Sequence, residues 1–143
     1  MKNNAVDVYF TLHPEASDIA SIYNGLVSFN SPHFQDLNEI QFGAFVRDEN
    51  GDIVGGLTGR IFDSALQINY LWLSDSIRSQ GVGTALLEKV ELEAKALDIA
   101  TLCVDTYSFQ APDFYGKLGF VEMGRYVNYP KSGIDKIFFH KNI

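Results

Sequence analysis

A change of hydrophobic period between residues 67 and 105 is the feature that most restricts the fold of this chain. Gln67 to Leu73 is rich in Ile, Tyr and Trp, which favour β-strands. From Gly83 to Leu97, apolar residues recur at spacings of three and four, which predicts an amphipathic helix. Ile99 to Asp105 is then a short apolar run typical of a buried strand. Strand, helix and strand in this order predict a parallel βαβ unit with a right-handed crossover.

Hairpin signals flank this unit on both sides. Asn50-Gly51 separates two strand patterns, 40–47 and 53–61, and is typical of a tight antiparallel turn. Further strands at 120–129 and 134–141 surround the turn at 130–133, and a short helix is expected at 112–118. The pattern predicts an α+β fold: a mixed, mostly antiparallel sheet with a central parallel βαβ unit and flanking helices.

The first forty residues carry weaker signals. Alternation of Val6, Val8 and Phe10 with their neighbours predicts a strand over 5–11, and Pro14 to about Tyr23 is expected to be helical. Residues 24–38 contain Gly25 and Pro32, which favours a loop or two short helical pieces. No linker-like stretch or repeat interrupts the chain, so residues 1–143 are expected to form a single domain.

The charge excludes some partners. The 143 residues have a formal net charge of −7, and 46% of them are hydrophobic, as in a packed globule. An acidic chain without a basic stripe is a poor candidate for binding nucleic acid or anionic membranes. Residues 1–70 hold three cationic side chains against nine acidic ones, whereas residues 71–143 are nearly balanced. The two halves are therefore expected to meet ligands of different charge.

The compartment is expected to be the cytoplasm. The first residues lack the apolar core of a signal peptide, and no apolar run approaches the roughly 20 residues that span a bilayer. The single cysteine, Cys103, cannot form an internal disulfide and is expected to be a buried strand thiol. The three histidines, His13, His33 and His140, lack ligand spacing, so no metal site is expected.

A glycine-containing turn, Arg78-Ser79-Gln80-Gly81-Val82-Gly83-Thr84, lies between the first strand of the βαβ unit and its helix. Its glycines let the backbone curl closely around a ligand, and the free N–H groups of the first helical turn point into that curl. A pyrophosphate is the natural occupant. The turn is neither a Walker A loop nor a complete dinucleotide fingerprint. On spacing alone, a strand-to-helix turn without a ligand is the alternative.

Two motifs in this order resemble the GCN5-related N-acetyltransferase (GNAT) family. Arg-x-x-Gly-x-Gly at Arg78 to Gly83, preceded by the strand Tyr70 to Leu73, resembles the acyl-CoA signature of that family. Phe114 to Phe120, read as Phe-Tyr-Gly-Lys-Leu-Gly-Phe, is similar to its Phe-Tyr-x-Lys-x-Gly-Phe segment. The resemblance covers residues 40–140 well and the first forty in outline. It implies an acetyl-CoA-dependent N-acetyltransferase.

The resemblance also implies which residues contact coenzyme A. Backbone amides would hold the pyrophosphate; they belong to Gln80, Gly81, Val82, Gly83 and Thr84, with Arg78 and Ser79 at the edge of the loop. The pantetheine arm would pair with the backbone of Leu71, Trp72 and Leu73, where the two parallel strands splay. The family usually has Asn six residues before the Phe of Phe-Tyr, whereas this chain has Ser108; Gln110 nearby is the candidate for the missing amide.

The chemistry of acetyl transfer needs a neutral amine, a donor to the carbonyl oxygen and a proton for the departing thiolate. A backbone N–H near Leu73 is the expected carbonyl donor. The resemblance places Tyr115 beside the thioester sulfur, and a phenol with a pKa of about 10 is protonated at neutral pH, so Tyr115 is the predicted general acid. Cys103 has no visible activator, so direct attack by the amine is expected rather than a covalent enzyme intermediate.

The expected acceptor is a primary amine of a small, cationic molecule or of a peptide. Its positive charge would be attracted to the acidic residues 1–70. Five side chains could act as the base: Asp36, Glu39, Asp63, Asp105 and His33. Aromatic side chains that could line the acceptor pocket are Phe29, Phe34, Tyr107, Phe109 and Tyr129. The alternative function is a non-catalytic acyl-CoA-binding or sensing module. A homodimer through the C-terminal strands is also considered, since the last strand is a candidate sheet edge.

Overall fold

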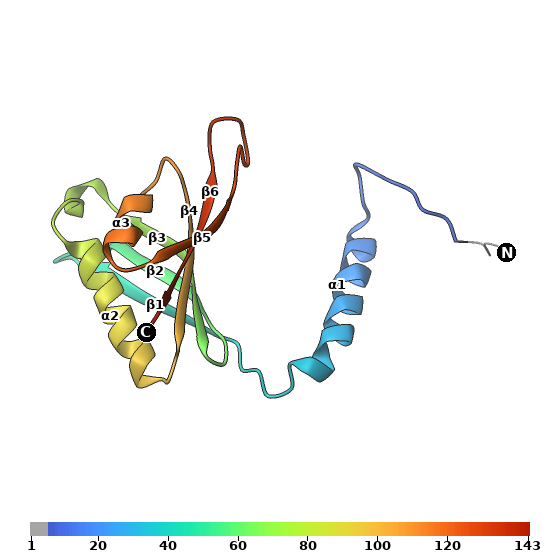
Figure 1. Cartoon of the computed structure of the whole chain (residues 1–143), viewed down its shortest axis with the longest axis horizontal. Helices are drawn as coiled ribbons and strands as arrows, with labels where there is room; N and C mark the ends of the chain where they lie inside the picture. The colour runs from blue at the N-terminus through green and yellow to red at the C-terminus, as the bar shows by residue number, and fades with distance from the viewer. Residues whose placement is uncertain (1–5) are drawn as a thin grey trace. The chain divides into compact units, whose positions relative to one another are not determined.

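The computed structural model describes residues 6–143, which fall into two compact units, one ending at Asp36 and the other covering Leu37–Ile143 (Figure 1). The first unit contains α1 (Ala16–Asn30) and the short 3-10 helix η1 (Ser31–His33). No side chain of α1 is buried, although its sequence is rich in apolar residues. Among residues 6–36, the first unit therefore has no hydrophobic core of its own.

Two predictions for this unit are wrong. Residues 6–11 form no strand, and Ala5, the first residue of that prediction, lies outside the described residues. Alternation marks only which side of a strand is apolar, whereas a strand also needs a partner for its backbone hydrogen bonds, and residues 6–36 contain no other strand. Helix α1 runs through Gly25 to Asn30, beyond the predicted end, because one glycine costs a helix only about 1 kcal/mol.

The second unit is a six-stranded mixed sheet with the strand order β1-β2-β3-β4-β6-β5. Its elements are, in chain order, β1 (Ile40–Arg47), β2 (Ile53–Ile61), β3 (Ala65–Leu73), the 3-10 helix η2 (Asp75–Ile77), α2 (Val82–Ala96), β4 (Thr101–Tyr107), α3 (Pro112–Lys117), β5 (Val121–Tyr126) and β6 (Lys136–Asn142). Strands β3 and β4 are parallel and every other pair is antiparallel. The predicted α+β class and its central βαβ unit are confirmed. The single-domain expectation stays a prediction.

Helices α2 and α3 pack against the same face of the sheet (Figure 1). Along β4, Leu102, Val104 and Thr106 are buried on this face, while the intervening residues point to the other. Leu87 and Val90 of α2 pack onto the same core, as the helical spacing predicts. Among residues 6–143, no helix is long and apolar enough to cross a bilayer.

The last strand is an interior strand. Strand β6 pairs with β4 along one side and with β5 along the other, so the edges of the sheet are β1 and β5. The expectation that the last strand forms an edge is wrong, because a hairpin returning from β5 inserts β6 beside β4. Dimerisation through an edge formed by β6 therefore has no basis in the fold.

Gly59 gives a stability prediction. It sits at a register shift in β2, where an added Cβ would overlap the backbone oxygen of Gln67 on β3. We expect Gly59→Ala to lower the free energy of unfolding by about 2–3 kcal/mol, measured by urea denaturation. Gly124→Ala is the matched control: a Cβ at this strand position meets nothing, so the change should stay within about 1 kcal/mol. Equal effects of the two substitutions would contradict the prediction.

Candidate active site

The parallel strands β3 and β4 separate part-way along their length. Their pairing runs from Ala65 opposite Thr101 to Ile68 opposite Val104 and then stops, although β3 continues to Leu73 and β4 to Tyr107. On its other side, β3 remains paired with β2 as far as Leu73. Between residues 69–73 and 105–107, the sheet therefore has an opening edged by backbone polar groups. Such an opening can accept an extended chain that pairs as an additional strand.

The segment that follows β3 leads through η2 to the N-terminus of α2. Gly81 is the N-cap residue, with a left-handed φ of +79°, and no side chain caps the helix. The first helical backbone bond runs from the Ala85 N–H to the Gly81 carbonyl, so the N–H groups of residues 82–84 are free of backbone partners. An added Cβ at Gly81 would meet nothing within 4 Å, so open space lies beside these donors. This is the geometry of an anion site.

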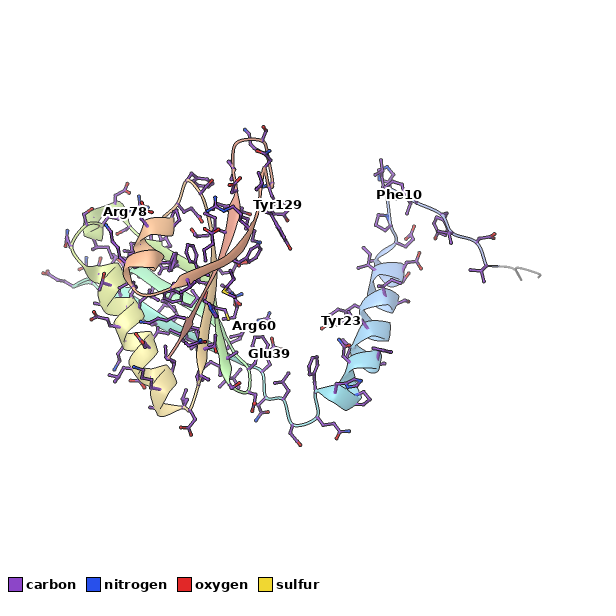
Figure 2. All side chains as sticks on the ribbon, viewed as in Figure 1. Phe10, Tyr23, Glu39, Arg60, Arg78 and Tyr129 are labelled. Atoms are coloured by element: carbon purple, nitrogen blue, oxygen red, sulfur yellow. The ribbon has the colours of Figure 1, made fainter. Side chains whose placement is uncertain are left out.

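Arg78 holds the start of this loop in place (Figure 2). Its Nε donates to the backbone oxygen of Leu73 at 2.9 Å, and its terminal nitrogen lies 2.8 Å from Asp75. The side chain of Gln80 donates to the Ser76 carbonyl at 3.0 Å. Arg78 therefore fixes the end of β3 relative to the loop that precedes α2, a role that the sequence alone did not indicate.

Tyr115 is the buried aromatic of α3. Tyr115 is 5% exposed, and its ring packs against Phe114, Phe120 and Phe139. The Tyr115 hydroxyl has no hydrogen-bond partner within residues 6–143. Among the described residues, every side-chain N or O atom that is fully buried has such a partner, so this hydroxyl is in contact with solvent. Burial, and secondly the nearby carboxylate of Asp105, raise the pKa of Tyr115 to about 12. The phenol therefore keeps its proton well above neutral pH.

The loop after β4 is tied down by its own side chains. Gln110 accepts hydrogen bonds from the backbone N–H of Tyr107 at 2.8 Å and from the Thr106 hydroxyl at 3.1 Å. The Ser108 hydroxyl accepts from the backbone N–H of Asp135 at 3.0 Å. Both residues thus hold the protein's own loop, and their contact with coenzyme A stays a prediction.

Of the three candidate bases within Leu37–Ile143, Asp105 lies at the opening. Asp105 is the first residue of β4 beyond its paired stretch with β3. Glu39 is bound to Arg60 at 2.6 Å (Figure 2). Asp63 lies before the first residue of β3, at the opposite end of this strand from Leu73. His33 and Asp36 belong to the first unit. Among the described residues, no three His, Cys, Asp or Glu side chains gather as metal ligands.

A separate hollow of about 490 Å³ is lined by residues of β1, β2, β3 and α2. Its walls are almost entirely apolar, with side chains such as Phe42, Val46 and Leu86, and its only charged residues, Lys89 and Glu93, pair with each other. Without a free polar group it offers nothing to acyl-transfer chemistry, so the opening between β3 and β4 remains the candidate site.

The fold and this site define a class of protein, and comparison with known proteins agrees. The Acetyltransferase (GNAT) family matches residues 11–120, and the chain belongs to this family. It is 29% identical over 90 residues to blasticidin-S acetyltransferase of Streptomyces morookaense, a match spanning 62% of this chain and 66% of that protein. The family predicted from Arg78–Gly83 and Phe114–Phe120 is confirmed, as is the acetyltransferase class.

Solved structures give the same fold. An acetyltransferase from Bacillus cereus ATCC 14579 superimposes with a TM-score of 0.84 at 31% identity, covering 94% of this chain and 98% of its own. An aminoglycoside 6'-N-acetyltransferase solved with coenzyme A superimposes with a TM-score of 0.62 at 17% identity, covering 71% and 72% of the two chains. At 17% identity, the similarity to the aminoglycoside acetyltransferase shows a shared fold and no more.

Proposed function

We propose that this chain transfers an acetyl group from acetyl-CoA directly to a primary amine of a small, cationic molecule or of a peptide. One observation carries the proposal: the opening between β3 and β4 lies at the end of β3 from which the chain passes, through η2, to the uncapped N-terminus of α2. An extended, polar arm and a pyrophosphate are the two parts of coenzyme A that such neighbouring features would hold. Relatives that bind coenzyme A support this assignment.

The residues present fit the cofactor. The backbone of Leu71 to Leu73 would pair with the pantetheine arm, and amides from Gln80 to Thr84 would hold the pyrophosphate, with Arg78 and Ser79 at the loop edge. Gly83 has a second role: it is buried, and a Cβ there would come within 3.1 Å of the Phe114 ring. Its small size therefore lets α3, and with it Tyr115, approach the start of α2.

The bound thioester supplies the acetyl group. In the proposed reaction the neutral amine nitrogen attacks the carbonyl carbon, forming the C–N bond as the C–S bond breaks. A backbone N–H near Leu73 donates to the carbonyl oxygen as it gains negative charge. The Tyr115 hydroxyl donates its proton to the departing sulfur, and the resulting phenolate takes a proton back from solvent. The amine nitrogen releases one proton to solvent as the amide forms.

Acetyl-CoA binding is tested by thermal unfolding. At a concentration one hundred times its Kd, a ligand that binds only the folded chain stabilises it by about 2.7 kcal/mol. For a chain of this size we expect acetyl-CoA to raise the Tm by roughly 9 °C. Desulfo-CoA, which keeps the pyrophosphate and pantetheine arm, should give a similar rise. An unchanged Tm at saturating acetyl-CoA would refute the cofactor assignment.

An assay of coenzyme A release by the same protein distinguishes an enzyme from a non-catalytic binding module. Coenzyme A release is followed while polyamines, aminoglycosides, amino acids and peptides are offered as acceptors. Release with a cationic amine supports the proposed transfer, whereas a raised Tm without release by any acceptor would favour a non-catalytic acyl-CoA sensor. Preference for neutral or acidic acceptors would contradict the cationic substrate.

A further inference from the structure

Lys136 places its ammonium group among aromatic rings and a carboxylate. Its Nζ lies 5.8 Å from the ring centre of Tyr129, 5.6 Å from that of Phe138 and 3.9 Å from a carboxylate oxygen of Asp105. Only 25% of the Lys136 side chain is exposed, which is low for a lysine. Rings and a carboxylate around one ammonium are the components by which proteins recognise alkylammonium groups. We call Asp105, Tyr129 and Phe138 the amine box.

The amine box is at the opening in the sheet. Asp105 follows Val104, the last residue of β4 that pairs with β3, and it lies directly opposite Phe138 on β6. The charge of Asp105 also raises the pKa of Tyr115, as a second cause after burial. The carboxylate therefore lies at the gap, on the face of β4 opposite the buried Val104 and Thr106.

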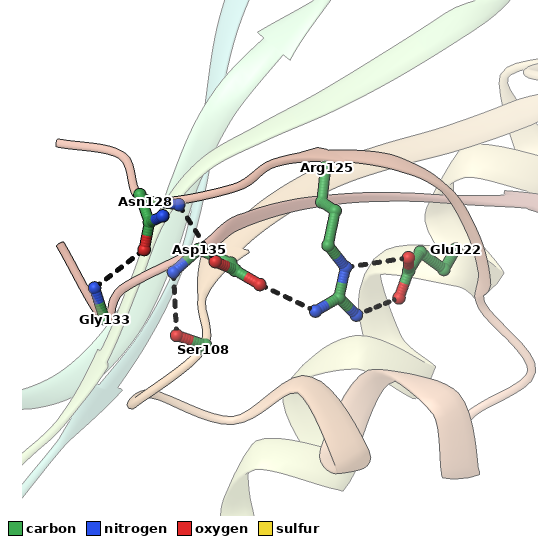
Figure 3. Close-up of polar contacts among 6 residues, drawn as sticks. All are labelled: Ser108, Glu122, Arg125, Asn128, Gly133 and Asp135. Atoms are coloured by element: carbon green, nitrogen blue, oxygen red, sulfur yellow. Dashed lines mark hydrogen bonds and ion pairs between the residues drawn. The ribbon is translucent and has the colours of Figure 1, made fainter. Parts of the chain in front are cut away.

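A polar network holds the β5–β6 hairpin, which carries Tyr129 and Phe138 of the amine box (Figure 3). Arg125 makes a two-pronged contact with Glu122, at 2.6 and 3.1 Å, and a 3.0 Å contact with Asp135, next to Lys136. Asp135 also accepts from the backbone N–H of Asn128, next to Tyr129. The Asn128 N–H and, secondly, Arg125 lower the pKa of Asp135, so these contacts hold at neutral pH.

Neighbouring rings support the box. Tyr126 packs edge-on against Tyr129, with ring centres 5.2 Å apart, and against Phe138, with centres 4.9 Å apart. The two rings that face the ammonium are therefore backed by a third. A site whose members are fixed before the ligand arrives loses less conformational freedom on binding.

We infer that the amine box binds the reacting amino group of the acceptor and that Lys136 occupies it as an internal competitor when no acceptor is present. The inference rests on the proposed N-acetyltransferase function and specifies its substrate class: a primary ammonium at the end of an unbranched alkyl chain. The resident lysine side chain shows the shape and charge that fit. An entering ammonium takes the place of Nζ, which moves out to solvent, and the acceptor then loses one proton to water before it attacks.

The test is an NMR titration of the full chain with n-butylammonium, with and without coenzyme A. Lys136→Met keeps most of the stem but removes the competing charge, so its Kd should be at least about fivefold lower than that of the wild type. Asp105→Asn removes the counter-ion and should raise the Kd by at least about fivefold. Lys131→Met is the matched control: it removes an exposed lysine from the loop of the same β5–β6 hairpin and should leave the Kd unchanged.

Turnover provides a second readout. With n-butylamine as acceptor, Lys136→Met should lower KM and keep kcat, a change that a purely structural role of Lys136 would not produce. Tighter n-butylammonium binding by Lys136→Met supports the box even where no acetyl transfer is seen, a result that would contradict only the proposed reaction. Unchanged or weaker binding by Lys136→Met, beside normal acetyl-CoA binding, would overturn the box and leave the proposed reaction standing.

Discussion

Replacing Gly81 with valine is expected to raise the Kd for acetyl-CoA by about a hundredfold or more. The valine side chain would fill the open space beside the free N–H groups at the start of α2, and its branched Cβ is incompatible with a φ of +79°. Each hydrogen bond to a charged group is worth about 1.5–3 kcal/mol, so losing two of them is enough for this change. Isothermal titration calorimetry with acetyl-CoA measures it directly.

Gly51→Val separates loss of the site from backbone strain. Gly51 has a similar φ of +83° and also has open space beside it, but it lies in the turn between β1 and β2. This control should lose stability to a comparable extent and still bind acetyl-CoA with wild-type affinity. If Gly51→Val lost binding equally, or if Gly81→Val kept it, the pyrophosphate assignment to this loop would be wrong.

Replacing Tyr115 with phenylalanine should lower kcat by about 10²–10³-fold with little change in the Kd for acetyl-CoA. Phenylalanine keeps the ring that packs against Phe120 and Phe139, and only the hydroxyl that donates to the leaving sulfur is lost. Because the pKa of Tyr115 is raised to about 12, the phenol stays protonated through neutral and moderately alkaline pH. The wild-type kcat should therefore show no loss from phenol ionisation below about pH 11.

Tyr9→Phe is the matched control, since it removes one phenol hydroxyl from an exposed side chain. It should keep the wild-type kcat, and both variants should keep the wild-type Tm. A kcat for Tyr115→Phe within twofold of the wild type across the pH range would exclude Tyr115 as the general acid.

Local patterns in the sequence were sufficient for most of the fold. The spacing of Leu87, Val90 and Ala94 predicts α2, and Asn50-Gly51 predicts the hairpin between β1 and β2, because helical period and turn geometry depend on residues close together in the chain. The wrong prediction of a strand near the N-terminus also comes from using local patterns alone. Alternation at Val6, Val8 and Phe10 specifies an apolar side but supplies no partner, and no strand forms there.

Some features of the candidate site likewise follow from the local sequence, and others follow only from the packing of the whole sheet. The sequence by itself determined the glycine turn, the Phe-Tyr segment and the crossover that brings them to one end of the sheet, since each follows from a short motif or from the handedness of a βαβ unit. Only the tertiary structure decided where β3 and β4 separate, that β6 lies between β4 and β5, and that Lys136 meets Asp105. Strand register and contacts between distant residues depend on how the whole sheet packs, and no short segment encodes them.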